Sequence, residues 1–430
     1  MRKTPVLVTL AAAAVAAGIA VPTALATSGP TPAPAPSVAD APGSGQSVID
    51  WNRRLITILG TPNAQPPTIH PTRSFAMLQA AEYDAVASIT HAAPPYRAAV
   101  VPPPGVARPD AAADQAAHDV LAALYPSARA DLDTQLAGEL APIPDGRPKQ
   151  DGVAVGAAAA RDIVAARATD GAAATPAPFT AGTAPGDYRP TPPKNAAPMY
   201  TTWGGVAPFV LKDARQVTVA PPPPVSSPTY AAALDEVRTL GRDTSTTRTP
   251  DQTVAGKFWS SAPVWNTWNQ VAQQAATDRH ATLGQTTAAF SALDLALADT
   301  TIAMYDAKYA DPVWRPVTAI QVGAGDPTWN PLTPTAADPS YPGAHSALSA
   351  AASTVLTNFY GPGQAVSVTS AADPGVTRRF ATVADVANEA ALSRIWAGQH
   401  TRIDDEAGRQ LGRQVAGVVL DDVAVHGAGS

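Results

Sequence analysis

Three short segments in the last third of the sequence carry the residues best suited to chemistry. They are KYADPVWRP (308–316), PSYPGAHSA (339–347) and SRIWAGQHTRID (393–404). Together they supply three fixed cations, two histidines and a carboxylate: Lys308, Arg315, Arg394, His345, His400 and Asp404. Two arginines can hold a tetrahedral oxyanion through planar, paired N–H donors, and a lysine adds a point charge. The combination favours a site for a phosphate-like anion.

The two histidines have different expected roles. His345 lies where a helix should begin, and the free N–H groups and dipole of a helix N-terminus favour an anion. Gly343, two residues earlier, allows the backbone to approach a ligand closely. His400 and Asp404 are four apart, so on a helix the carboxylate can accept from one ring nitrogen and leave the other as a nucleophile or ligand. His345 would then be a general acid or base.

Each segment has a simpler interpretation when taken alone. Lys308 and Arg315 could be solvated charges, and His345 could be a helix cap. His400 and Asp404 could form a surface pair, and Arg394 could be a structural ion-pair partner of Glu389 or Asp404. The occurrence of all three segments in order, each with its charged and imidazole members, favours a shared site.

Helix-type spacing of apolar residues dominates the rest of the chain. Helices are expected after His345 and over residues 47–60, 72–90, 114–125, 151–167, 229–241, 249–261, 266–279, 283–310, 381–398 and 404–423. Strand signals are sparse, and GQAVSVTS (363–370) is the best of them. Residues 171–227 are Pro-rich, but their aromatic residues indicate an ordered loop over the core. These patterns predict an all-α protein built from helical bundles with Pro-rich ordered loops.

The N-terminal region has the composition of a secretory leader. Residues 1–26 combine a basic start, an apolar run and a small-residue cleavage site, which predicts a signal peptide and a secreted, extracellular protein. Residues 27–46 are a Pro/Ala-rich linker, and residues 47–430 are expected to form the helical catalytic domain. No later stretch is apolar enough to predict stable membrane insertion.

The overall composition excludes several classes of site. The sequence has no cysteine, so a disulfide framework or a thiolate metal site is impossible. The formal net charge of −6 argues against a nucleic-acid partner. An anion site must therefore be a local concentration of positive charge. Asp299, inside an apolar helix, needs a buried partner, and one of the site cations is the candidate.

The three segments read K-x6-R-P, P-x-x-H-S and S-R-x5-H-x3-D. This order resembles the three-part signature of the superfamily of type 2 phosphatidic acid phosphatases and vanadium haloperoxidases. Flanking phrases such as FAMLQAAEYDAVASI (75–89) and ALADTTIAMYDAKYADPVWRPVTAI (296–320) resemble the haloperoxidase branch of secreted bacterial proteins. The likeness extends over residues 47–423, nearly all of the expected mature chain.

The resemblance implies a fold of two helical bundles with the oxyanion site between them. It implies that three cations bind the oxygens of vanadate or phosphate: Lys308, Arg315 and Arg394. It makes His345 the acid/base, His400 the ligand of the vanadium in vanadate, and Asp404 the residue that orients His400. A protein of this kind uses vanadate as cofactor, and hydrogen peroxide and a halide as substrates.

Two departures from the family pattern keep other functions open. Gly343-Ala344 stands where the family usually has Ser-Gly, so the backbone N–H groups of Gly343 and Ala344 are expected to replace a hydroxyl donor in part. Asp338 stands where haloperoxidases often have an aromatic residue or histidine near the halide. Both favour the alternative of an acid phosphatase that hydrolyses a phosphate ester with His400 as nucleophile. A second alternative is a non-catalytic, oxyanion-binding secreted protein.

Overall fold

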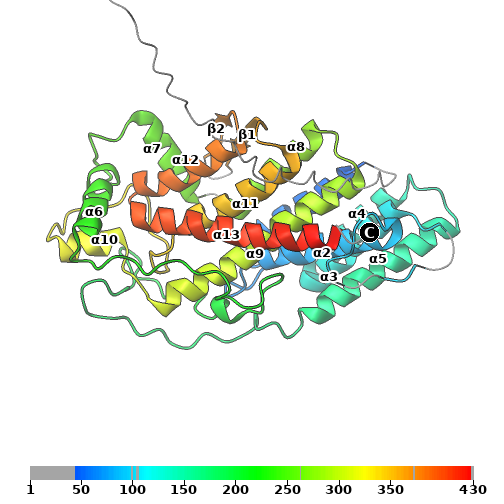
Figure 1. Ribbon diagram of the computed structural model, residues 1–430, viewed down its shortest axis with the longest axis horizontal. Helices are drawn as coiled ribbons and strands as arrows, with labels where there is room; N and C mark the ends of the chain where they lie inside the picture. The colour runs from blue at the N-terminus through cyan, green and yellow to red at the C-terminus, as the bar shows by residue number, and fades with distance from the viewer. Residues whose placement is uncertain (1–43, 98–99, 103–105, 262, 371–372, 428–430) are drawn as a thin grey trace, which may run out of the picture. The chain divides into compact units, whose positions relative to one another are not determined.

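The computed structural model describes residues 44–97, 100–102, 106–261, 263–370 and 373–427. The predicted signal peptide (1–26) and residues 27–43 of the predicted linker lie outside the described residues. The helices are α1 Gln46–Leu59, α2 Thr72–Thr90, α3 Pro109–Leu124, α4 Arg129–Leu140, α5 Arg147–Ala166, α6 Pro228–Leu240, α7 Pro250–Ser261, α8 Val264–Asp278, α9 Leu283–Ala310, α10 Pro316–Thr318, α11 Ala344–Tyr360, α12 Val383–Trp396 and α13 Arg402–Gly427. The predicted all-α class is confirmed (Figure 1).

Three elements were not predicted from the sequence, the three-residue α10 among them. Helix α4 was not expected, because Leu132 is its one buried residue and an apolar face is therefore missing. Strand β1 (Val366–Thr369) lies within the predicted strand, and it pairs antiparallel with β2 (Thr377–Phe380), Val366 opposite Phe380. The sequence TRRF gives no alternation of apolar and polar residues, so β2 had no signal of its own.

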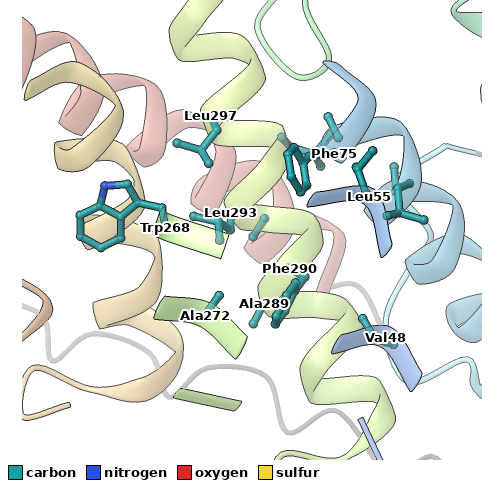
Figure 2. Packing of buried hydrophobic residues seen from close by; sticks show 14 of the residues in the cluster. Val48, Leu55, Phe75, Trp268, Ala272, Ala289, Phe290, Leu293 and Leu297 are labelled. Atoms are coloured by element: carbon teal, nitrogen blue, oxygen red, sulfur yellow. The ribbon is translucent and has the colours of Figure 1, made fainter. Parts of the chain in front are cut away.

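Helix α9 belongs to two groups of packed helices. Helices α2, α3 and α5 pack on one another, and α2 also packs on α9. Helices α7, α11, α12 and α13 form the second group, in which α11 and α13 contact α9. Figure 2 shows Phe290 and Leu293 of α9 between Phe75 of α2 on one side and Trp268 of α8 on the other. Because α9 is buried on all sides in this half, its apolar residues do not form a single stripe.

Small residues let α11 and α13 approach each other closely. A Cβ atom at Gly408 would lie 2.4 Å from the carbonyl oxygen of Gly343, and one at Gly412 would lie 2.0 Å from that of Ala347. Neither position therefore admits a side chain without movement of the helix backbone. The two glycines of α13 thus fix the distance between the start of α11 and the start of α13, which both carry predicted site residues.

Asp299 of α9 has a different partner from the one predicted. Its carboxylate accepts hydrogen bonds from the backbone N–H groups of Phe209, Val210 and Leu211, at 2.6, 2.8 and 2.8 Å. The prediction of a site cation as partner is therefore wrong. Asp299 instead ties the Pro-rich segment to the central helix. No helix among the described residues is both long and apolar enough to span a bilayer, α9 included.

A second buried carboxylate of α9, Asp294, makes stability depend on pH. One oxygen accepts from Asn269 at 2.9 Å and the other has no hydrogen-bond partner in the described part of the chain, and burial raises the pKa of Asp294 to about 8. Because the folded pKa lies above the unfolded value of about 4, stability is fully present below the unfolded pKa and declines as pH rises toward 8.

We expect Asp294→Asn to prevent the decline in stability as pH rises toward 8. The variant should exceed the native protein in free energy of unfolding by about 2 kcal/mol at pH 8, and the gain should vanish near pH 4. Urea unfolding across that range measures it. Asp235→Asn, which removes an exposed carboxylate of α6, serves as the control. If Asp294→Asn changes the free energy of unfolding by the same amount at pH 8 and at pH 4, the expectation is contradicted.

Candidate active site

The structure brings the six residues singled out in the sequence to one set of helix ends. Lys308 lies in the last turn of α9, Arg315 just before α10, His345 in the first turn of α11, Arg394 in the last turn of α12, and His400 and Asp404 on either side of the start of α13. Hydrogen bonds join them. Gln399 accepts from Arg315 through its carbonyl oxygen and from Arg394 through its side chain, and the carbonyl of Trp259 accepts from both Arg394 and His345.

His400 has a defined tautomer. Its Nε2 lies 2.9 Å from Nη1 of Arg315, which is always a donor, so Nε2 carries a lone pair and no proton. Its Nδ1 faces Oδ2 of Asp404 at 3.4 Å. Burial and then the charge of Arg315 lower the pKa of His400 to about 3, against the opposing effect of Asp404. His400 is therefore a neutral imidazole whose Nε2 lone pair accepts from Arg315 within the cation cluster, and an unprotonated Nε2 is what a nucleophile or ligand requires.

Asp404 is itself held in place by neighbours. Its Oδ2 accepts from the Ser340 hydroxyl and from the Thr401 backbone N–H, each at 2.7 Å. Burial would raise the pKa of Asp404, but the contact with His400 and these donors hold it below its usual range. Ser340 was not singled out in the sequence, although it lies only five residues before His345. Its hydroxyl orients Asp404, which in turn orients His400.

Lys308 and Arg315 are buried around a single carboxylate. Nζ of Lys308 lies 3.2 Å from Oδ2 of Asp338, and Nη2 of Arg315 contacts Oδ1 of the same residue. Burial lowers the pKa of Lys308 to about 8, and Asp338 opposes that shift. Burial would raise the pKa of Asp338, but the two cations hold it well below its usual range. Asp338 is therefore an ionised member of the cation cluster.

Arg394 has an unused buried donor. Its Nη1 donates to the Trp259 carbonyl and the Ser260 hydroxyl, and its Nη2 donates to Gln399. Its Nε is buried and has no acceptor among the described residues. Neither carboxylate considered from the sequence binds it, since Glu389 pairs with Arg378. An unpaired buried guanidinium N–H is costly, so a bound anion is the acceptor that this geometry lacks.

His345 is half-buried at the start of α11. Its Nε2 lies 3.0 Å from the carbonyl oxygen of Trp259, which can only accept, so Nε2 carries the proton and Nδ1 is free to accept one. Burial and then the nearby Arg394 hold the pKa of His345 well below its usual range. His345 is thus a neutral base. No sequence signal could have located its partner, because the partner is a backbone carbonyl of α7.

The predicted backbone donors are only partly available. The N–H of Gly343 donates to the carbonyl oxygen of Asp404 at 2.8 Å, which ties α11 to α13. Its predicted role as an oxyanion donor is therefore not available in this arrangement. The N–H of Ala344 has no acceptor among the described residues. Of the two predicted donors, Ala344 alone is left to face an anion.

The residues of this site suit a tetrahedral oxyanion. Its three cations outnumber the two carboxylates Asp338 and Asp404, and both histidines are neutral, so one positive charge is in excess. The unpaired Nε of Arg394 and the lone pair of His400 are matched to an oxyanion such as vanadate or phosphate. Within the described residues, no group of three or more His, Asp or Glu side chains is arranged to hold a bare metal ion.

Comparisons with known proteins agree with the helical fold. A family model described as the VCPO second helical-bundle domain matches residues 288–428, which contain all six residues. No curated protein sequence matched. A structure described as the first bacterial vanadium-dependent iodoperoxidase is 26% identical, with a TM-score of 0.78 over 88% of this chain and 96% of that one.

Two further structures share the fold. The holo form of a bacterial vanadium-dependent chloroperoxidase is 17% identical, with a TM-score of 0.66 over 87% of this chain and 98% of that one. The apo form of a bacterial vanadium-dependent chloroperoxidase is 16% identical, with a TM-score of 0.67 over 86% of this chain and 96% of that one. The match of the family model over residues 288–428 and the fold shared with these structures support the resemblance of this chain to the superfamily of vanadium haloperoxidases and type 2 phosphatidic acid phosphatases.

Proposed function

We propose that this protein is a secreted vanadium-dependent haloperoxidase that oxidises a halide with hydrogen peroxide. The observation that carries the proposal is the unprotonated Nε2 of His400, which faces a cluster of buried cations that includes an arginine with an unpaired donor. The 26% identity to a vanadium-dependent iodoperoxidase over most of both chains supports it. The composition of residues 1–26 supports secretion.

Each residue has a distinct part in this function. Arg394 and Arg315 would bind the oxygens of vanadate, Lys308 would add its positive charge while its own N–H groups remain on protein oxygens, and His400 would bind the vanadium through Nε2. Bound vanadate would supply the chemistry by which hydrogen peroxide oxidises a halide. Asp404 keeps the proton of His400 on Nδ1 and so keeps Nε2 available. His345 would accept a proton from an incoming acidic group at Nδ1, because its Nε2 proton is held by the Trp259 carbonyl.

A bromination assay tests the proposal. We expect the protein loaded with vanadate to brominate phenol red when bromide and hydrogen peroxide are present, and to lose this activity when vanadate is omitted. Vanadium content, measured on the same sample, shows whether loading succeeded. A protein that contains vanadium and yet oxidises neither bromide nor iodide at any pH would rule out the haloperoxidase.

An acid phosphatase is the second candidate, and Asp338 favours it. A carboxylate beside Lys308 and Arg315 weakens the attraction of the site for a halide anion. In this function Nε2 of His400 would attack the phosphorus of a phosphate ester and release the alcohol, and water would then hydrolyse the phosphohistidine. Hydrolysis of a generic phosphomonoester that vanadate inhibits, without halide oxidation, would support this candidate. Binding of oxyanions with neither activity would indicate a non-catalytic binding protein.

A further inference from the structure

Asp338 lies among the cations that the proposed function assigns to the oxyanion. Its two carboxylate oxygens are divided between them, with Oδ2 on Lys308 and Oδ1 on Arg315. Its backbone carbonyl accepts a further bond from Nε of Arg315 at 2.7 Å. Asp338 is 5% exposed, so its charge is not screened by bulk water. Any anion held by these two cations is therefore held close to a fixed negative charge.

Few donors of these two cations remain for a ligand. Nζ of Lys308 faces three oxygens, the carbonyls of Pro339 and Ser340 and Oδ2 of Asp338, which matches the three N–H bonds of an ammonium group. Arg315 uses four of its five N–H donors, two on Asp338, one on the Gln399 carbonyl and one on His400. The fifth N–H of Arg315 is on Nη2, the nitrogen that also contacts Oδ1 of Asp338, so an oxyanion that accepts from it lies beside that carboxylate oxygen. Each carboxylate oxygen keeps a lone pair that can accept another hydrogen bond but cannot donate one.

Whether the bound oxyanion carries a proton decides whether its contact with the Asp338 carboxylate is favourable. An oxyanion with an O–H group can donate it to Asp338, which adds a charge-assisted hydrogen bond. An oxyanion without a proton sets its own negative oxygen against the carboxylate, with no hydrogen between them. Near neutral pH inorganic phosphate and vanadate carry an O–H group, whereas sulfate carries none.

We propose that Asp338 makes this pocket select oxyanions that carry a proton, phosphate and vanadate, and reject sulfate. The inference rests on the proposed function as an oxyanion site, whether the reaction is halide oxidation or phosphate-ester hydrolysis. It assigns Asp338 a role in specificity that its position in the sequence, near the expected halide site, did not suggest. The two cations that hold Asp338 ionised also keep it from accepting a proton of its own near neutral pH.

Binding measurements with three inorganic probes test the inference without reference to activity. Calorimetric titration of the full-length protein at neutral pH should give an affinity for phosphate and for orthovanadate at least tenfold higher than for sulfate. Asp338→Asn keeps the volume and one acceptor of the side chain, and it should bind sulfate within about threefold of phosphate. Asp235→Asn, which also removes one carboxylate but on the exposed face of α6, should retain the native preference.

The possible outcomes separate the inference from the function on which it rests. Native protein that binds sulfate as well as phosphate overturns the inference and leaves the oxyanion site intact. Asp338→Asn that still rejects sulfate at least tenfold also overturns it. If neither the native protein nor the variants bind any of the three anions, the proposed function itself fails. Thermal unfolding checks each variant, and Asp338→Ser replaces Asp338→Asn if the latter does not fold.

Discussion

Replacing His400 with alanine is expected to abolish both bromination and phosphomonoester hydrolysis, whichever of the two the native protein performs. We expect activity to fall about 1,000-fold or more, as it does when an enzyme loses the group that forms a bond to the reacting centre. The reason is geometric: Nε2 of His400 has a lone pair, no proton and a buried cation at 2.9 Å. The loss of kcat is measured with saturating vanadate and halide, or with saturating phosphate ester.

A matched histidine variant controls for this result. His280→Asn removes an exposed histidine at a left-handed backbone position, which asparagine tolerates, and it should keep native activity. Circular dichroism and thermal unfolding show whether His400→Ala remains folded. If folded His400→Ala retains more than about a tenth of the native rate, then His400 is neither the ligand nor the nucleophile.

Asp299→Ala is expected to lower the free energy of unfolding by about 3–5 kcal/mol. The substitution removes the common acceptor of three buried backbone N–H groups, those of Phe209, Val210 and Leu211. An unsatisfied buried donor costs about 1–3 kcal/mol, and the three losses are not fully additive. Because the same bonds tie the Pro-rich segment to α9, the variant should also be cleaved faster within residues 206–227 by a broad-specificity protease.

A neighbouring carboxylate on the same helix provides the comparison. Asp306 pairs with the exposed Arg215, and Asp306→Ala should change the free energy of unfolding by less than about 1 kcal/mol. Chemical denaturation of both variants measures the difference. Asp299→Ala with a stability equal to that of Asp306→Ala would show that the three N–H groups find other acceptors and that Asp299 is not the anchor.

Much of the fold followed from local patterns. The long apolar run over 283–310 predicted α9 to its exact bounds, because a helix with a capping box at Thr282 and a long periodic interior depends little on distant residues. Helix α4 and strand β2 were missed because their stability comes from what they contact. With a single buried residue in α4 and no alternation in β2, neither carries an internal pattern that could reveal it.

The sequence by itself determined which side chains form the site and how their types suit an oxyanion. Spacing put His400 and Asp404 four residues apart, and the order of the three segments was sufficient to reveal the resemblance to the superfamily. Such information is local: it is written in residue identity and in separations of a few positions along one chain segment.

The tertiary structure decided how these side chains are paired. It pairs Asp338 with Lys308 and Arg315, and the N–H of Gly343 joins α11 to α13. Within the residues that the structure describes, it leaves Nε of Arg394 without an acceptor. The physical reason is that many partners are backbone groups, which every residue carries and no sequence pattern marks. The others are side chains from separate segments, and their distances follow from how the helices pack.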